Sequence, residues 1–234
     1  MKPLFFDQSI LHFFNQFANR SPWFDHFIYM IADNNLLKGG VMFSVCWYIW
    51  FTYPGAQMQK TRKGVLTTFL VAFVAEATCI ILSLTLPYRA RPFLNPELAL
   101  NIPLKLDKWW DTISSFPSDH GTLFMAISFG IWQTNKKFGW ACLLYTIIFI
   151  YFPRMYLGLH YPSDILGGAL IGICFVLIGF NVKFISTGTD YILKFAEQKP
   201  HFFYPLLFLL TYQLSDLFLD TRELLGFIRH PLGK

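Results

Sequence analysis

Residues 64–86 read GVLTTFLVAFVAEATCIILSLTL, and this stretch decides the fold. A helix needs about 20 mainly apolar residues to cross a bilayer, and this is the longest such run in the chain. The composition agrees, since 54% of the residues are hydrophobic and only 14% are charged, about half the charged fraction of a soluble domain. We therefore predict an all-α, polytopic membrane helical bundle in a single domain, residues 1–234.

Further apolar stretches on both sides of this segment predict five to six transmembrane helices in all. Two of them, residues 120–134 and 138–152, are short for a span unless they extend into their flanks. The last is interrupted by Pro205 and Asp216. Besides residues 64–86, the predicted spans are residues 37–53, 120–134, 138–152, 164–185 and 203–219.

The N-terminal segments are amphipathic rather than uniformly apolar. In residues 4–18 the large apolar side chains fall on one helical face, which is typical of a helix lying at the membrane interface. Ser21 and Pro22 predict the start of a second short interfacial helix, residues 22–33, because serine caps helices and proline suits their first turn. The domain then divides into interfacial helices at 1–36, a catalytic core at 37–185 and a C-terminal extension at 186–234 that carries the sixth span.

Basic residues in the short connections predict how the bundle is oriented. Loops 54–63 and 186–202 and the turn 135–137 carry lysine and arginine on one side of the membrane, and the positive-inside rule makes that side cytoplasmic. Loops 87–119 and 153–163 then lie on the outer face. The net charge of +5 is scattered rather than gathered in a run, which argues against a nucleic-acid partner.

Three polar clusters interrupt this apolar chain, each at the end of a predicted helix on the outer face. Charged residues are costly at membrane depth, so a group of them indicates function. Together they contain what phosphate-ester cleavage requires: a nucleophile, a proton donor, an orienting carboxylate and cations. The clusters are Arg89-Ala90-Arg91-Pro92, Pro117-Ser118-Asp119-His120, and the segment from Arg154 through His160 to Asp164.

The third cluster places His160 four residues before Asp164, in the loop that enters an apolar helix. A carboxylate that accepts a hydrogen bond from one imidazole nitrogen leaves the other nitrogen free to act as a nucleophile or base. Taken alone, Asp164 is equally well explained as a helix N-cap. A single His160 is more often an interfacial hydrogen-bonding residue than a catalytic one.

The second and first clusters supply the remaining groups. Ser118 and His120 open a helix, whose free N–H groups and positive dipole end suit a phosphate, and His120 could protonate a leaving oxygen. Arginine matches phosphate oxygens with its planar fork, which suits Arg89 and Arg91. Each cluster alone is explained by a capping turn or by arginines that reach the interface; their combination on one face favours the functional interpretation.

These residues resemble the signature of the type-2 phosphatidic acid phosphatase superfamily. The second and third parts of that signature match at Pro117-Ser118-Asp119-His120 and from Arg154 through His160 to Asp164, and the first matches at Arg91-Pro92. The resemblance implies that His160 forms a phosphohistidine, Asp164 holds its imidazole, and His120 protonates the leaving group. It also implies phosphate binding by Arg91, Arg154 and Ser118, with no metal or other cofactor.

Two positions depart from the family pattern. Leu84 stands where the signature has a lysine, and Pro153 stands where it has a serine. We expect Arg89 to supply a substitute cation for the phosphate.

The sequence therefore predicts a lipid phosphatase of the cytoplasmic (inner) membrane with its active site on the periplasmic or extracellular face. Its expected substrate is a lipid phosphomonoester or diphosphate, such as undecaprenyl diphosphate, phosphatidate or phosphatidylglycerol phosphate. Two alternatives stay open. One is a phosphotransferase in which a lipid acceptor replaces water, and the other is a non-catalytic lipid-binding or transport protein, which the departures at Leu84 and Pro153 would favour.

Overall fold

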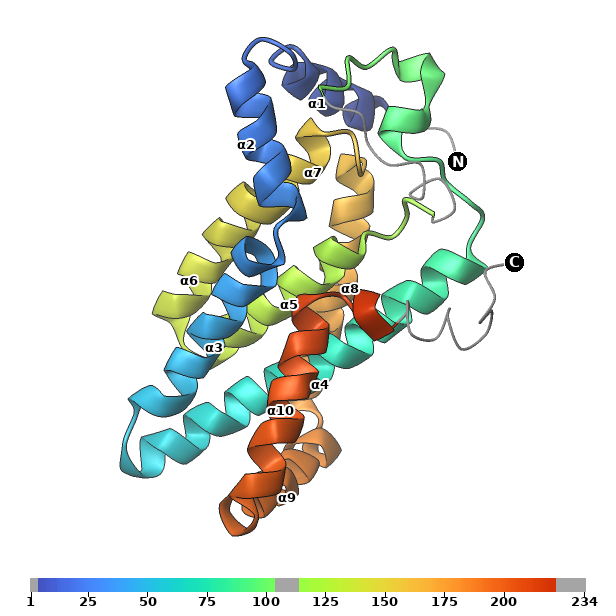
Figure 1. Cartoon of the computed structure of the whole chain (residues 1–234). Coiled ribbons are helices and arrows are strands. Elements are labelled where there is room, and N and C mark those ends of the chain that lie inside the picture. Colours follow the sequence, from blue (N-terminus) through green and yellow to red (C-terminus); the bar gives the residue numbers. More distant parts are fainter. Residues whose placement is uncertain (1–3, 104–113, 222–234) are drawn as a thin grey trace, which may run out of the picture.

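The computed structural model describes residues 4–103 and 114–221, and every regular element in these ranges is helical (Figure 1). The α-helices are α1 (Phe5–Asn15), α2 (Pro22–Asp33), α3 (Val41–Thr52), α4 (Gly55–Thr85), α5 (Asp119–Thr134), α6 (Lys136–Tyr145), α7 (Phe152–Tyr156), α8 (Pro162–Asn181), α9 (Lys183–Gln198) and α10 (Pro200–Ser215). Two π-helical segments, η1 (Leu36–Gly40) and η5 (Thr146–Tyr151), and two 3₁₀ turns, η2 (Pro92–Leu94) and η3 (Pro96–Leu98), complete the elements.

Helix α5 is at the centre of the bundle and packs closely against α4 and α8. Its Gly130 faces α4 so tightly that an added Cβ would lie 2.5 Å from side-chain atoms of Thr68. A Cβ on Gly172 of α8 would lie 2.6 Å from the Thr122 carbonyl oxygen. Small residues at such contacts let helix backbones approach each other within a membrane. This packing holds the N-terminal end of α5 close to the start of α8.

Among the described residues, three helical segments are long and apolar enough to cross a membrane: Gly55–Thr85, Lys136–Tyr156 and Pro162–Asn181. The apolar segment Leu36–Thr52 is shorter. Helices α5 and α10 have 16 residues each, about 24 Å at 1.5 Å per residue, against a hydrocarbon core of about 30 Å. The all-helical membrane class is therefore supported, whereas a count of five to six spans stays a prediction.

Several predicted boundaries are wrong. Residues 54–63 do not form a loop, because α4 begins at Gly55 and carries its basic residues in the first turns. Most of the predicted loop 186–202 belongs to the amphipathic helix α9. The predicted span 138–152 continues to Tyr156, and η5 lies just before Pro153, where the helix lacks a backbone N–H and a wider turn is tolerated.

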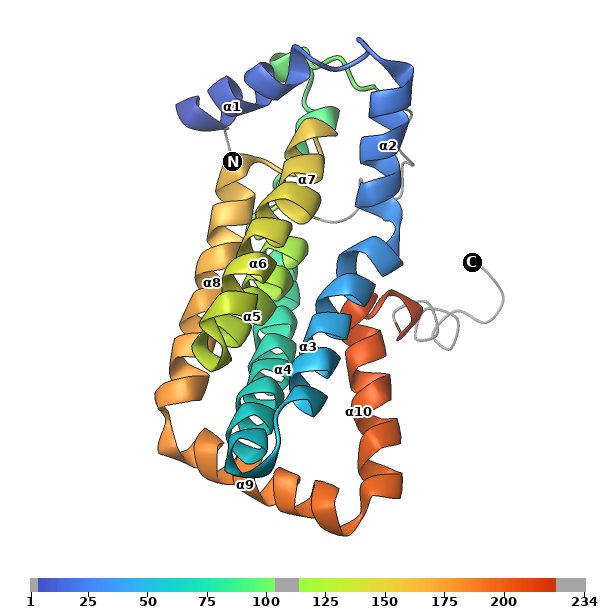
Figure 2. The ribbon, with the colours of Figure 1, turned by 90° about the vertical axis from the view of Figure 1, so that its left-hand side faces the viewer.

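The two ends of the bundle carry different side chains. At one end the α5–α6 turn meets the α3–α4 turn, since Asn135 Nδ2 donates to Tyr53 Oη at 2.7 Å. Lys63 there pairs with Asp190 of α9 at 2.6 Å. Figure 2 shows α9 lying across this end and α1 across the other. The basic connections therefore share one end, and the three polar clusters gather at the opposite end.

The N-terminal helices form where they were predicted. Helix α2 begins at Pro22, and the Ser21 hydroxyl accepts a hydrogen bond from Phe24 N at 3.4 Å. Helix α1 is attached to the polar end of the bundle, because Asn15 and Asn101 exchange two hydrogen bonds of 2.9 Å. The two helices thus lie at the end of the bundle that carries the three polar clusters.

Candidate active site

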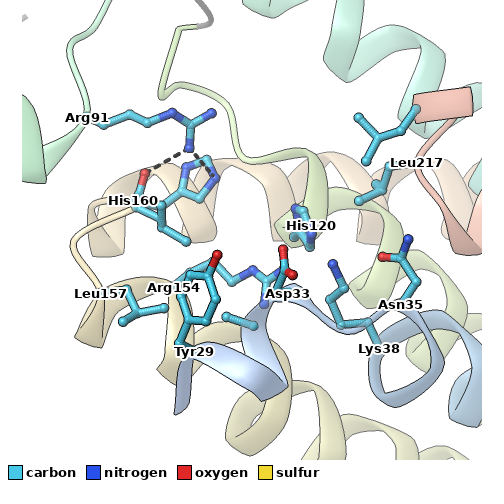
Figure 3. A pocket seen from close by; sticks show the side chains of 13 residues that line it. Tyr29, Asp33, Asn35, Lys38, Arg91, His120, Arg154, Leu157, His160 and Leu217 are labelled. Atoms are coloured by element: carbon cyan, nitrogen blue, oxygen red, sulfur yellow. Dashed lines mark hydrogen bonds between the residues drawn. The ribbon is translucent and has the colours of Figure 1, made fainter. Parts of the chain in front are cut away.

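A cavity of about 280 Å³ opens at the polar end of the bundle (Figure 3). Its size is near the lower limit of small-ligand sites, about 300–1,000 Å³. It brings together residues from α2, η1, α5, α7 and the segments after α4, α7 and α10. The lining residues are Tyr29, Ala32, Asp33, Asn35, Lys38, Arg91, His120, Arg154, Leu157, Leu159, His160, Leu217 and Leu219.

The hydrogen bonds of His160 determine which ring nitrogen is protonated and which can act as a nucleophile. Its Nδ1 lies 3.0 Å from the Ser115 carbonyl oxygen, which can only accept, so Nδ1 carries the proton. Its Nε2 lies 3.2 Å from Nη1 of Arg91, which can only donate. Both neighbours therefore select the tautomer with a lone pair on Nε2, the atom that faces the cavity.

The charge state of His160 also suits nucleophilic attack. Burial lowers the pKa of His160, and the Arg91 guanidinium lowers it further, while Asp164 and Asp119 oppose the shift. The side chain is 3% exposed, so the desolvation of a charged imidazole is the main cause. The imidazole is consequently neutral at neutral pH.

Asp164 reaches His160 through Ser115 rather than directly. The carboxylate is 3.8 Å from His160 Nδ1, which is too far for a hydrogen bond. It accepts a short hydrogen bond from Ser115 Oγ, and the carbonyl of the same Ser115 holds the imidazole. Asp164 also accepts from Tyr161 N at 2.8 Å, from the third position of α8, so it caps the helix by reaching back rather than as the N-cap residue.

Arg89 does not face the cavity, contrary to the expectation that it supplies a phosphate-binding cation. Its guanidinium makes a short ion pair with Asp164 and a second one of 2.9 Å with Asp7 of α1. It also donates to Ser163 Oγ at 2.8 Å and stacks over the Tyr161 ring at 4.0 Å. Arg89 is directed away from the cavity because two buried carboxylates compensate its charge. Arg89 therefore fixes α1 and the start of α8 to each other.

His120 is positioned by its neighbour Asp119. Its Nδ1 lies 2.8 Å from Asp119 Oδ1, and its Nε2 is buried without a hydrogen-bond partner among residues 4–103 and 114–221. The same carboxylate oxygen lies 4.0 Å from His160 Nε2, so Asp119 stands between the two histidines. A carboxylate on one ring nitrogen stabilises the imidazolium, which can then donate a proton from the other nitrogen.

Of the other predicted phosphate ligands, Arg91 and Arg154 line the cavity and Ser118 does not. The Ser118 hydroxyl accepts from Gly121 N at 3.1 Å and caps α5. Arg91 Nη1 donates to the Leu159 carbonyl oxygen at 3.0 Å. Within the part of the chain that the structure describes, the buried Nε and Nη1 of Arg154 have no hydrogen-bond partner, and burying such donors unpaired is costly. Arg154 therefore offers an anion two free donors in a fixed direction.

A third cation was missed in the sequence. Lys38 lines the cavity from η1 and is only 6% exposed. By contrast Leu84, at the position where the family signature has a lysine, is 78% exposed and does not line the cavity. Lys38 escaped notice because a lysine at the edge of an apolar segment usually reaches the interface.

The cavity can hold an anion beside a neutral nucleophilic imidazole and a potential proton donor. Three basic residues, Arg91, Arg154 and Lys38, line it, and Asp33 is the one acid among the described lining residues. Such a set of fixed donors around an anion suits phosphoryl transfer, in which positioning and positive charge provide most of the catalysis. Within the described ranges no group of three or more histidine, cysteine or acidic residues is arranged to hold a metal ion.

Comparison with known proteins gives a consistent family assignment. The PAP2 superfamily matches residues 64–187, which include the candidate nucleophile His160 and the candidate acid His120 but not Lys38. No solved structure matches the chain.

Three curated relatives illustrate the likeness. Undecaprenyl-diphosphatase BcrC of Bacillus subtilis is 31% identical over 121 residues, 52% of this chain and 57% of the relative. Bacitracin transport permease protein BcrC of Bacillus licheniformis is 34% identical over 122 residues, 52% and 56% of the two chains. The chain thus spans a little over half the length of these two relatives. Lipid A 1-diphosphate synthase of Escherichia coli is 27% identical over 212 residues, 82% and 81% of the two chains.

Proposed function

The chain belongs to the PAP2 superfamily, and from this premise we propose that it is a membrane-embedded lipid phosphatase working through a phosphohistidine. One observation carries the proposal: His160, His120, Arg91 and Arg154 come from three separate polar clusters and line one cavity. The unprotonated Nε2 of His160, which accepts a hydrogen bond from Arg91, gives that cavity a nucleophile.

In the first step His160 Nε2 attacks phosphorus and the bond from phosphorus to the leaving oxygen breaks. His160 Nδ1 keeps its proton throughout and donates it in a hydrogen bond of 3.0 Å to the Ser115 carbonyl oxygen. His120 donates the proton that the leaving oxygen needs, from the Nε2 that faces away from Asp119. The products are a phosphohistidine and the free alcohol, or a lipid monophosphate if the substrate is a diphosphate.

In the second step water replaces the histidine. His120, now neutral, takes a proton from the water as its oxygen attacks phosphorus, and the N–P bond to His160 breaks. Inorganic phosphate leaves and His120 is again protonated, with Asp119 compensating its charge at 2.8 Å. The guanidinium groups of Arg91 and Arg154 stabilise the phosphoryl oxygens in both steps, since fixed cations act most strongly in a dry site.

The expected substrate is a lipid phosphate or diphosphate whose apolar tail stays in the bilayer. Two of the relatives above are named for undecaprenyl diphosphate and for bacitracin transport, which supports undecaprenyl diphosphate, with phosphatidate and phosphatidylglycerol phosphate as the other candidates. The polar clusters share the end opposite the basic connections, and the positive-inside rule puts that end outside. We therefore locate the site on the periplasmic or extracellular face of the cytoplasmic membrane.

Phosphate release by the purified protein tests this function. A panel of lipid phosphates and diphosphates is incubated with and without a chelator, and with orthovanadate as a phosphate analogue. We expect turnover that a chelator leaves unchanged, that vanadate inhibits and that His160→Ala abolishes. Unchanged turnover by His160→Ala refutes the assignment, and binding without any turnover favours a lipid-binding or transport protein.

Phosphotransfer to a lipid acceptor is the second candidate. The match to lipid A 1-diphosphate synthase extends over 82% of this chain, beyond the family segment at 64–187. A transferase would use the same phosphohistidine and differ only in the group that accepts the phosphate. Incubation with a labelled lipid diphosphate, with and without lipid A as acceptor, separates the two: transfer yields a labelled acceptor, whereas hydrolysis yields inorganic phosphate alone.

A further inference from the structure

Lys38 is a buried lysine that the proposed mechanism does not use. The residue is 6% exposed and lines the cavity, and its ammonium has no hydrogen bond or ion pair with any residue in 4–103 or 114–221. Figure 3 shows this ammonium directed into the cavity on the side of His120. Burying a charge without a partner is costly, so the position calls for an anionic ligand.

Three contacts hold the segment that carries Lys38 in place. The carbonyl of Leu37 accepts a short hydrogen bond from Tyr145 Oη, and Asn35 Nδ2 donates to Asp216 Oδ1 at 2.7 Å. Gly39 meets the end of α10 so closely that an added Cβ would lie 2.5 Å from Ser215 Oγ. The segment is η1, a π-helical turn, and such turns occur frequently at functional sites. Its position depends on α10, which gives the C-terminal extension a role in the site.

The arrangement of the cations separates two subsites. His160 and Arg91 are joined at 3.2 Å on one side of the cavity, where the attacked phosphoryl group would lie. An in-line displacement puts the leaving oxygen on the far side, next to His120. Figure 3 shows Lys38 and Asn35 on the His120 side, with Asp33 between them and Arg154.

A leaving alcohol and a leaving phosphate make different demands on this far side. A proton from His120 is sufficient to neutralise an alkoxide. A leaving lipid phosphate keeps further negative charge after it accepts the proton, and that charge needs a nearby cation. The acids at this side, Asp33 and the Asp216 partner of Asn35, would otherwise repel it.

We propose that Lys38 binds the second, leaving phosphate of a lipid diphosphate, and so makes the enzyme a diphosphatase by preference. The inference rests on the proposed function, since the mechanism defines which side the leaving group occupies. Lys38 would give the site a cation from outside the matched segment 64–187. This chain has Leu84 at the position where the family signature has a lysine.

The test compares two substrates that differ by one phosphate, farnesyl diphosphate and farnesyl monophosphate. Lys38→Met keeps the length and apolar stem of the side chain but removes the charge. A hydrogen bond to a charged group contributes about 1.5–3 kcal/mol, so kcat/KM for the diphosphate should fall roughly 10- to 150-fold. The value for the monophosphate should change less than about threefold, and Lys38→Arg should restore part of the diphosphate activity.

Lys137→Met is the matched control, because it makes the same change at an exposed lysine in the turn at the opposite end of the bundle. We expect it to leave both activities unchanged. Thermal unfolding in detergent shows whether Lys38→Met is folded. An equal loss for both substrates, or no loss for either, overturns the assignment of Lys38 to the second phosphate.

Binding of inorganic pyrophosphate and phosphate, measured by calorimetry, tests the proposal without turnover. The wild type should bind pyrophosphate more tightly than phosphate, and Lys38→Met should lose that difference. Equal affinities in the wild type, or an unchanged difference in Lys38→Met, contradict the proposal even if the protein hydrolyses no lipid. Failure of the proposed function is distinct, because His160→Ala would then leave phosphate release from both farnesyl substrates unchanged.

Discussion

Replacing Asp7 with alanine should destabilise the active-site end of the bundle far more than its place near the N-terminus suggests. The Asp7 carboxylate is fully buried and accepts hydrogen bonds from Arg89 Nη2 at 2.9 Å, Ser163 N at 2.8 Å, Ser163 Oγ at 2.7 Å and Leu4 N at 3.2 Å. Breaking a buried ion pair by removing one partner typically costs about 3–5 kcal/mol. We expect a loss of this size in the free energy of unfolding.

Asp7→Asn should show an intermediate effect, because the amide keeps an acceptor for Ser163 but loses its charge. The expected cost is about 1.5–3 kcal/mol, the contribution of a hydrogen bond to a charged group. Both variants should also lower phosphate release, since Arg89 links Asp7 to Asp164 and Asp164 supports His160 through Ser115.

The assay is denaturant unfolding in mixed micelles, followed by phosphate release at a temperature where each variant is folded. Asp190→Ala is the control, because its pair with Lys63 is shorter at 2.6 Å but exposed, with side-chain exposures of 58% and 31%. Exposed pairs contribute about 0–1 kcal/mol. If Asp7→Ala costs no more than Asp190→Ala, the reasoning that Asp7 anchors α1 to the site is refuted.

Two further predictions concern the two histidines. Because the pKa of His160 is lowered, its imidazole stays neutral at pH values below about 6.5, the ordinary histidine pKa, and kcat/KM should fall on acidification only below that pH. Arg91→Gln removes one cause of the shift and should move this acidic limb of the pH–rate profile to higher pH. An unmoved limb contradicts its assignment to His160. Asp119→Asn removes the carboxylate that supports a proton on His120 and should lower kcat for a lipid phosphate by about 100-fold or more, the size of a general-acid contribution. The loss should be smaller for a substrate with a good leaving group such as p-nitrophenol. An equal loss for the lipid and the p-nitrophenyl substrate would exclude proton donation as its cause.

The two histidines and two arginines that line the cavity were predictable, because each lies in a short motif whose chemistry is local. Arg91, His120, Arg154 and His160 all occur near helix ends in a chain of which only 14% is charged. Four polar signals in an apolar background stand out without knowledge of the packing. The structure adds their convergence on one cavity.

The residues that support these side chains were not predictable from local patterns. Asp7 belongs to none of the three polar clusters, yet it meets Ser163 from 156 positions away in the sequence. The role of Arg89 changed for the same reason, since its two carboxylate partners come from α1 and α8. An acid within an apolar helical segment, one turn before Leu11, was the sequence signal that could have indicated a buried partner; the structure shows both side chains buried.

Lys38 shows the same limit at the edge of a predicted span. A lysine there is normally explained by its flexible stem reaching the interface. Only the turn η1 and its contacts with Tyr145 and Ser215 direct it inward. Long-range packing of this kind has no periodic signature in the sequence.

The central claim is that His160 becomes covalently phosphorylated during turnover. Rapid quenching with a substrate labelled in its terminal phosphate, followed by peptide mapping under alkaline conditions that preserve phosphohistidine, tests it most directly. We predict label on the peptide that contains His160 in the wild type and none in His160→Ala. Phosphate release by the wild type with no label on that peptide, or label on the peptide containing His120 instead, would contradict the account.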